Sequence, residues 1–128
     1  MKNNALKRIQ EMTPYIPPQF GRRIYRGVCL DFNERTTTPS IKVKKAIQNL
    51  LDSDTLQLYP EYGKLEKKLA KYTKTTANQI LITNGSDQAI DLVFRAFTEV
   101  RDTVVIPAPS FTMFSQAAQV IGNTVLSP

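Results

Sequence analysis

The chain has 128 residues, 41% hydrophobic and 22% charged, with 17 Lys and Arg against 11 Asp and Glu and a net charge of +6. These values are ordinary for one soluble globular domain. The sequence contains no histidine, which excludes Ser-His-Asp and Cys-His catalysis, histidine metal sites and imidazole acid–base chemistry. We expect no metal site, and any proton carrier has to be Lys, Tyr, Cys, a carboxylate or a cofactor.

In chain order, residues 1–39 predict an N-terminal arm whose short helical start ends at Pro14, because proline interrupts a helix. Apolar residues at helical spacing predict a helix over residues 40–51 and a second amphipathic helix after the turn at residues 62–63. The apolar positions that define the two helices are Val43, Ala46, Ile47, Leu50, Leu51, Leu65, Leu69 and Tyr72.

The pattern then changes to alternating strands and helices. The predicted elements are a buried strand at 79–83, a helix at 86–98, a strand at 103–106, a helix at 112–121 ended by Gly122, and a strand at 124–126. This β-α-β-α-β order predicts an α/β fold with parallel strands and right-handed crossovers. In the helix at 86–98, the residues expected to face inward are Ala89, Ile90, Val93, Phe94 and Phe97. Three strands are few for a parallel sheet, so we expect residues 40–128 to form an incomplete domain.

Cys29 is the only cysteine, which excludes an intrachain disulfide. Because it stands in the mostly apolar run 27–30, we expect a small core residue rather than a nucleophile. The N-terminal segment lacks the apolar stretch of a secretion signal, and no segment reaches the length of a membrane span. These features predict a cytoplasmic protein without a membrane partner.

Much of the positive charge lies on the two predicted helices of residues 40–74. The lysines are Lys42, Lys44, Lys45, Lys64, Lys67, Lys68, Lys71 and Lys74. Such a concentration is typical of a nucleic-acid-binding patch or of two solvated helix faces. Solvated faces are favoured, since neither an arginine cluster nor interleaved aromatic residues accompany the lysines.

The segment ILITNGSDQAIDLVFRAF, residues 80–97, carries the most information. Its Asn84-Gly85-Ser86-Asp87 turn joins a strand-like run to an amphipathic helix, where free N–H groups and the positive end of the helix dipole can bind a phosphate. Gly85 lets the backbone approach an oxyanion closely, and Ser86 adds a hydroxyl. The same turn also suits an ordinary cap, with Ser86 as the N-cap and Asp87 favoured by the dipole.

Three further segments carry candidate site residues. PAPSFTMF, residues 107–114, follows the next strand, so Phe111 is expected at the same sheet edge, where its ring can stack on a heteroaromatic ring or pack in the core. LYPEYG, residues 58–63, offers the phenol of Tyr59 to a phosphate or to rim packing. LDFNE, residues 30–34, alternates like a short strand that ends in polar residues.

Together and in this order, the four segments resemble the N-terminal half-domain of fold type I, aspartate-aminotransferase-like, pyridoxal-phosphate enzymes. Within that superfamily they are most similar to the histidinol-phosphate aminotransferases. The resemblance runs from about Tyr15 to the last residue, and the NGSDQAIDL segment is its most specific part. It implies a homodimeric, pyridoxal-phosphate-dependent transaminase of histidine biosynthesis, transferring an amino group between histidinol phosphate and 2-oxoglutarate.

The resemblance also implies roles for matching positions. The cofactor-binding residues would be Gly85, Ser86, Asp87, Phe111 and Tyr59. The first three would form a cup for the cofactor phosphate, Phe111 would stack on the pyridine ring, and Tyr59 would reach the partner's cofactor across a homodimer interface. Tyr15 would line the phosphate end of the substrate, and Asn33 would lie near its carboxylate.

Two departures limit the resemblance. Residues 35–39 read RTTTP, where relatives usually have Asn-Pro and a Gly-Pro turn, which leaves the exact substrate open. Transamination also needs a Schiff-base lysine, a carboxylate at the pyridinium nitrogen and an arginine for the substrate carboxylate. In the family these lie beyond the matched segment, so we assign no catalytic residue. We expect an N-terminal part that is inactive alone and binds the cofactor weakly or not at all.

Three alternatives remain open. The chain can be part of another class I/II aminotransferase, such as one for aromatic amino acids, or of a phospho-amino-acid decarboxylase. It can be a small basic module that binds nucleic acid, whose affinity would fall steeply with salt. It can also be a non-enzymatic subunit that completes a site with a second polypeptide.

Overall fold

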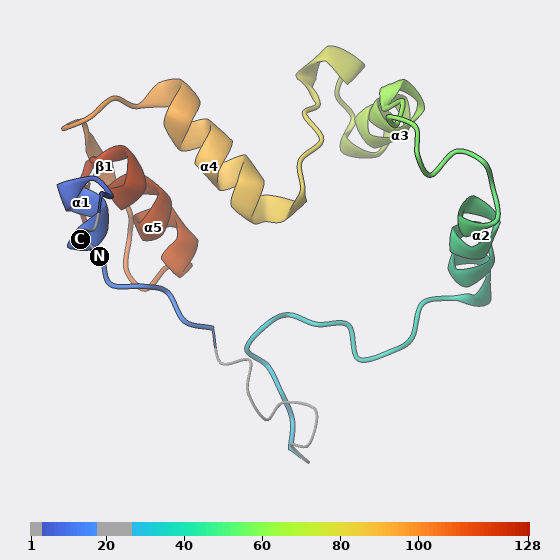
Figure 1. Cartoon of the computed structure of the whole chain (residues 1–128), viewed down its shortest axis with the longest axis horizontal. Helices are drawn as coiled ribbons and strands as arrows, with labels where there is room; N and C mark the ends of the chain where they lie inside the picture. The colour runs from blue at the N-terminus through green and yellow to red at the C-terminus, as the bar shows by residue number, and fades with distance from the viewer. Residues whose placement is uncertain (1–3, 18–26) are drawn as a thin grey trace. The chain divides into compact units, whose positions relative to one another are not determined.

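The computed structural model describes residues 4–17 and 27–128 (Figure 1). These residues divide into two compact units. One unit combines the described residues of the range 1–18 with residues 82–128, and the other is formed by the described residues of the range 19–81. The remaining residues of the predicted arm, 1–3 and 18–26, lie outside the described part of the chain.

The unit that contains residues 82–128 has an α/β arrangement. Its elements are α1 (Lys7–Gln10), α4 (Gly85–Phe97), β1 (Thr103–Val105), α5 (Thr112–Ile121) and β2 (Thr124–Leu126). β1 and β2 pair in parallel with Val104 opposite Val125, and α5 forms the crossover between them. The predicted β-α-β over residues 103–126 and the predicted α/β class are therefore confirmed.

The predicted strand at residues 79–83 is not formed. The segment follows a short 3-10 helix, η1 (Ala77–Gln79), and Ile80 has extended backbone angles, φ −110° and ψ 126°. A strand requires hydrogen bonds to a neighbouring strand, and the sheet of the described residues contains only β1 and β2. The prediction of a short strand at residues 30–34 was also wrong, because Asn33 has a left-handed backbone with φ 51° that interrupts the alternation.

The core of this unit consists of small and medium apolar residues. Ile106, Ala117 and Ala118 are buried, and α5 contacts α1, α4 and β2. The methyl side chains of Ala117 and Ala118 let α5 approach its neighbours closely. The prediction that Val93 and Phe97 face inward was wrong: Phe97 is 80% exposed and Val93 is also exposed.

Gly122 ends α5, as predicted. Its φ is 98°, and the N–H groups of Gly122 and Asn123 both donate to the carbonyl oxygen of Ala118, at 3.0 and 2.9 Å. This is the usual left-handed helix stop, which favours glycine. The carbonyl of Gly122 also accepts from Arg101 N–H at 2.9 Å, and the Asn123 amide donates to the Glu99 carbonyl at 2.7 Å. The stop therefore joins the loop after α4 to the loop before β2.

The second unit contains α2 (Ile41–Leu51), α3 (Gly63–Thr73) and η1. Ser40 caps α2, since its hydroxyl accepts from Val43 N–H at 3.4 Å. α3 packs against η1 and buries Ala70. Both predicted helices are confirmed.

The lysines of the two helices are exposed, as expected of solvated faces. Cys29, however, is exposed, so its predicted core position was wrong. Residues 27–40 form neither helix nor strand, and nothing therefore holds the apolar run around Cys29 against a core.

Within residues 4–17 and 27–128, no helix is long and apolar enough to cross a membrane. The same residues contain no group of three or more His, Cys, Asp and Glu side chains that could hold a metal ion.

Replacing Gly122 by Ala is expected to lower the free energy of unfolding by about 1–3 kcal/mol, because alanine is strained at positive φ. The new Cβ would also lie 3.3 Å from Arg8 Cδ and 3.3 Å from Val100 Cγ1. Urea unfolding followed by circular dichroism measures the change. Gly63→Ala is the matched control, since its Cβ would meet nothing within 4 Å. Equal stability of the two variants would contradict the assigned role of Gly122.

Candidate functional site

The candidate site is centred on the N-terminus of α4. The helix begins at Gly85, whose φ is 77°, and Asn84 is the N-cap. The alternative interpretation of Ser86 as an N-cap was wrong, since Asn84 is the N-cap and Ser86 lies inside the first turn. A Cβ at Gly85 would meet nothing within 4 Å, so the backbone conformation, not lack of space, requires glycine here.

The backbone donors of this turn divide into two groups. Gly85 N–H donates to the Thr83 carbonyl at 2.9 Å, and Asn84 N–H donates to the side-chain oxygen of Gln88. The next two N–H groups, of Ser86 and Asp87, have no acceptor within the described part of the chain. Helix N-termini with such groups bind anions.

The side chains at the turn are open to solvent. Ser86 and Asp87 are both exposed, and Asp87 is the acidic residue of the first turn of α4. Its carboxylate is favoured by the helix dipole but repels an approaching anion. The attraction for an anion therefore comes from the backbone N–H groups and from the Ser86 hydroxyl.

Farther along α4, Arg95 Nε donates to Asp91 Oδ2 at 2.7 Å. The hydrogen bond, followed by the Coulomb attraction of Asp91, raises the pKa of Arg95 above its ordinary value. The charge of Asp91 is thus balanced within the helix, one turn beyond Asp87.

Phe111 lies at the start of the next helix. It is the N-cap residue of α5, is 48% exposed, and forms an edge-to-face pair with Phe114, with ring centroids 6.4 Å apart and planes at 90°. Figure 1 shows α4 and α5 side by side and running in the same direction, and the two helices are in contact. The structure therefore brings Phe111 and the turn at residues 85–87 to the same end of the helix pair.

The other predicted site residues have different positions. Tyr15 belongs to the same unit and is 42% exposed. Tyr59, 99% exposed, and Asn33, also exposed, belong to the other unit. The roles predicted for these three residues stay predictions.

The predictions from sequence did not include Gln88, or Arg8 and Gln116 next to a surface groove. The spacing in the sequence does indicate the role of Gln88, because a side-chain amide four residues after Asn84 can reach back to the N-cap N–H. Arg8 and Gln116 bind backbone atoms 112 and 103 residues away in the sequence, so no local pattern reveals them.

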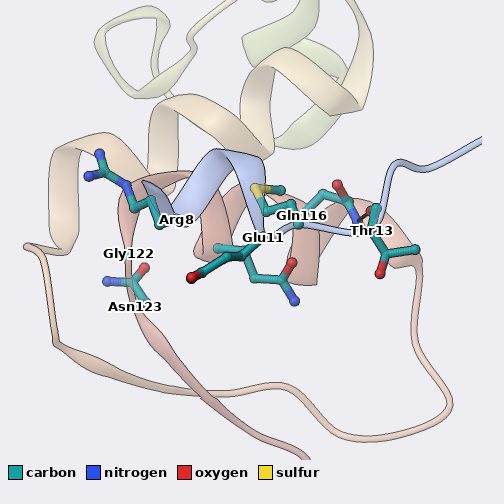
Figure 2. A pocket seen from close by; sticks show the side chains of 8 residues that line it. Arg8, Glu11, Thr13, Gln116, Gly122 and Asn123 are labelled. Carbon is teal, nitrogen blue, oxygen red and sulfur yellow. Dashed lines mark hydrogen bonds between the residues drawn. The ribbon is translucent and has the colours of Figure 1, made fainter. Parts of the chain in front are cut away.

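The groove lies between α1 and α5 and has a volume of about 440 Å³. It is lined by Arg8, Glu11, Met12, Thr13, Gln116, Gln119, Gly122 and Asn123 (Figure 2). Several of its polar groups already bind the protein: Gln116 Nε2 donates to the Thr13 carbonyl, and Arg8 Nε donates to that of Val120. None of the predicted site residues lines it.

Comparison with known proteins gives the family. The profile described as aminotransferase class I and II matches residues 26–127. The histidinol-phosphate aminotransferase of Caldanaerobacter subterraneus subsp. tengcongensis is 36% identical over 95 residues, which cover 73% of this chain and 27% of the relative. That of Methanocaldococcus jannaschii is 30% identical over 131 residues, covering 94% of this chain and 35% of the relative. The chain thus spans about a third of the length of these relatives.

Solved structures agree with the predicted fold. Histidinol-phosphate aminotransferase from Sinorhizobium meliloti, solved with pyridoxal-5'-phosphate, matches the whole chain and 35% of its own, with a TM-score of 0.80 and 22% identity. The α-aminoadipate aminotransferase LysN from Thermus thermophilus matches 67% of this chain and 23% of its own, with a TM-score of 0.60 and 30% identity. The fold is therefore that of part of a fold type I enzyme. The chain belongs to the aminotransferase class I and II family.

Proposed function

We propose that this chain is the N-terminal part of a transaminase that uses pyridoxal phosphate and acts on histidinol phosphate and 2-oxoglutarate. The observation that carries the proposal is the end of the α4–α5 pair, where two N–H groups without acceptors among the described residues lie at the same end as an exposed aromatic ring. The names of the relatives support the substrate pair.

In this proposal the chain holds the phosphate end of the cofactor. The N–H groups of Ser86 and Asp87 and the Ser86 hydroxyl bind the phosphate oxygens, and the positive end of the α4 dipole adds to the attraction. Phe111 stacks on the pyridine ring. Bound pyridoxal phosphate supplies the ring that accepts electrons during amino transfer. We assign no residue of this chain to the aldehyde of the cofactor.

At the substrate end, Tyr15 binds the substrate phosphate and Asn33 lies near its carboxylate. We further propose a cytoplasmic homodimer in which the exposed phenol of Tyr59 reaches the partner's cofactor phosphate. A phenol serves this purpose because it donates a hydrogen bond to a phosphate oxygen.

A second candidate reaction is decarboxylation of a phosphorylated amino acid. The L-threonine-O-3-phosphate decarboxylase of Porphyromonas gingivalis matches 73% of this chain and 29% of its own, with 27% identity and a TM-score of 0.60. Release of CO2, rather than amino transfer to 2-oxoglutarate, distinguishes this reaction.

Cofactor binding tests the phosphate cup directly. In ³¹P NMR titrations, the chain is expected to bind pyridoxal phosphate weakly and pyridoxal, which has no phosphate, much more weakly. Ser86→Ala removes one hydrogen bond to a charged group, which weakens pyridoxal phosphate binding about tenfold. Ser86→Pro removes the N–H as well, at a first-turn position where proline is tolerated, and weakens it further. Far-UV circular dichroism checks that both variants keep their helices.

Binding that does not depend on the phosphate would contradict the cup. If the Ser86 substitutions weakened the binding of pyridoxal and of pyridoxal phosphate equally, the cup would also be contradicted. Amino transfer catalysed by the 128-residue chain alone would contradict the assignment of the catalytic residues to other sequence.

A chimera tests the reaction and the role of Tyr59. When this chain replaces the matching segment of the M. jannaschii relative, amino transfer from histidinol phosphate to 2-oxoglutarate should be retained. In the chimera, Tyr59→Phe should weaken cofactor affinity about tenfold, the value of one hydrogen bond to a charged group. Tyr62→Phe, in the same turn and 50% exposed, is the matched control and should leave affinity unchanged. Equal effects of the two substitutions would contradict the role of Tyr59.

A further inference from the structure

The N-terminal arm is held along α5 by two hydrogen bonds from side chains to the backbone. Arg8 Nε donates to the Val120 carbonyl at 3.0 Å, and Gln116 Nε2 donates to the Thr13 carbonyl at 3.2 Å. Figure 2 shows Gln116 beside Thr13 at one end of the groove, and Arg8 at the other end. We call these two contacts the arm latch.

The Arg8 contact supplies a positive charge at the C-terminal end of α5. The last turn of this helix contains no basic residue, and the carbonyl groups of a last turn carry the negative end of the helix dipole. A guanidinium from the distant arm donates to one of these carbonyls and places a positive charge beside them. The contact therefore favours one docked position of the arm over others along the helix.

The order of the contacts makes the arm antiparallel to α5. From Arg8 to Thr13 the arm advances toward the C-terminus, while its partners move back from Val120 to Gln116. Continuing toward the N-terminus of α5 leads from Gln116 to Phe111 at the start of the helix. Tyr15 follows Thr13 by two residues, so an arm that continues in this direction places it on the Phe111 side of the latch.

Beyond the latch, the prolines of the arm favour an extended backbone. Pro14 and Pro17 keep the residues before them out of the helical region, and residues 13–17 form no helix. Two extended residues advance about 7 Å. The helix advances about 6 Å from Gln116 to Thr112, at about 1.5 Å per residue. The two distances match, so an extended arm that stays alongside α5 would place Tyr15 level with the first turn of α5.

We infer that Arg8 and Gln116 are positioning residues, which hold Tyr15 at the end of the α4–α5 pair that carries Ser86 and Phe111. The inference rests on the proposed function for the role of Tyr15 toward a phosphorylated substrate. The phenol of Tyr15, 42% exposed, is then presented to a phosphate ester at the end where the cofactor cup lies. Neither latch residue touches the ligand.

Disulfide trapping measures the position of the arm without any ligand. In a Cys29→Ser background, Tyr15→Cys is paired with Met113→Cys or, as the matched control, with Gln119→Cys. These partners lie three residues before and after Gln116, on the same side of α5. The Met113→Cys pair is expected to form its disulfide about tenfold faster, since a disulfide needs Cα atoms within about 7 Å. Arg8→Ala or Gln116→Ala should abolish the difference, and Arg8→Lys, which keeps a charged donor, should retain it.

A second measurement connects the arm to the cup. With fluorotyrosine in the chain, the Tyr15 ¹⁹F signal is assigned by its loss in Tyr15→Phe. Adding pyridoxal phosphate is expected to shift that signal in the original chain and in Arg8→Lys, but not in Arg8→Ala.

Equal trapping of the two cysteine pairs, or trapping unaffected by Arg8→Ala, would overturn the inference. So would cofactor binding seen by ³¹P NMR that leaves the Tyr15 signal unmoved. If no cofactor binds to the chain alone, the trapping rates by themselves decide the position of the arm.

Discussion

Parallel pairing of β1 with β2 is the constraint on which the candidate site depends. Two parallel strands in one sheet require a crossover, and α5 supplies it. Because α4 precedes β1 as α5 precedes β2, the two helices run in the same direction and their N-termini lie at one end. The turn at residues 85–87 and Phe111 therefore meet at that end, although a helix and a strand separate them in the sequence.

The candidate site uses backbone groups more than side chains. Its donors are the first N–H groups of α4, which are free because helix geometry provides no acceptor for them. The charge nearest to them, on Asp87, has the wrong sign for an anion. Backbone donors do not require particular side chains. The sequence of the turn alone is therefore as typical of a helix cap as of a phosphate site. Phe111 at the same end adds the second feature, which a cap does not need.

Much apolar surface of the described residues remains uncovered. The apolar stripe of α2, at Ile41, Ile47 and Leu50, is exposed, and so are Val105 and Leu126 on the two strands. In relatives about three times as long, further sequence is available to cover such surfaces. Two strands bury little by themselves, and the extended Ile80 has no strand to pair with among the described residues.

The sequence by itself determined the helices at residues 41–51, 63–73, 85–97 and 112–121, the stop at Gly122 and the α/β class, because local periodicity and backbone preferences decide these. Four motifs in a fixed order also indicated the family. Only the tertiary structure decided that residues 79–83 form no strand, that Cys29 and Phe97 are exposed, and that Arg8 and Gln116 hold the arm on α5. Pairing, burial and long-range hydrogen bonds depend on which distant segment lies alongside, and no local pattern carries that information.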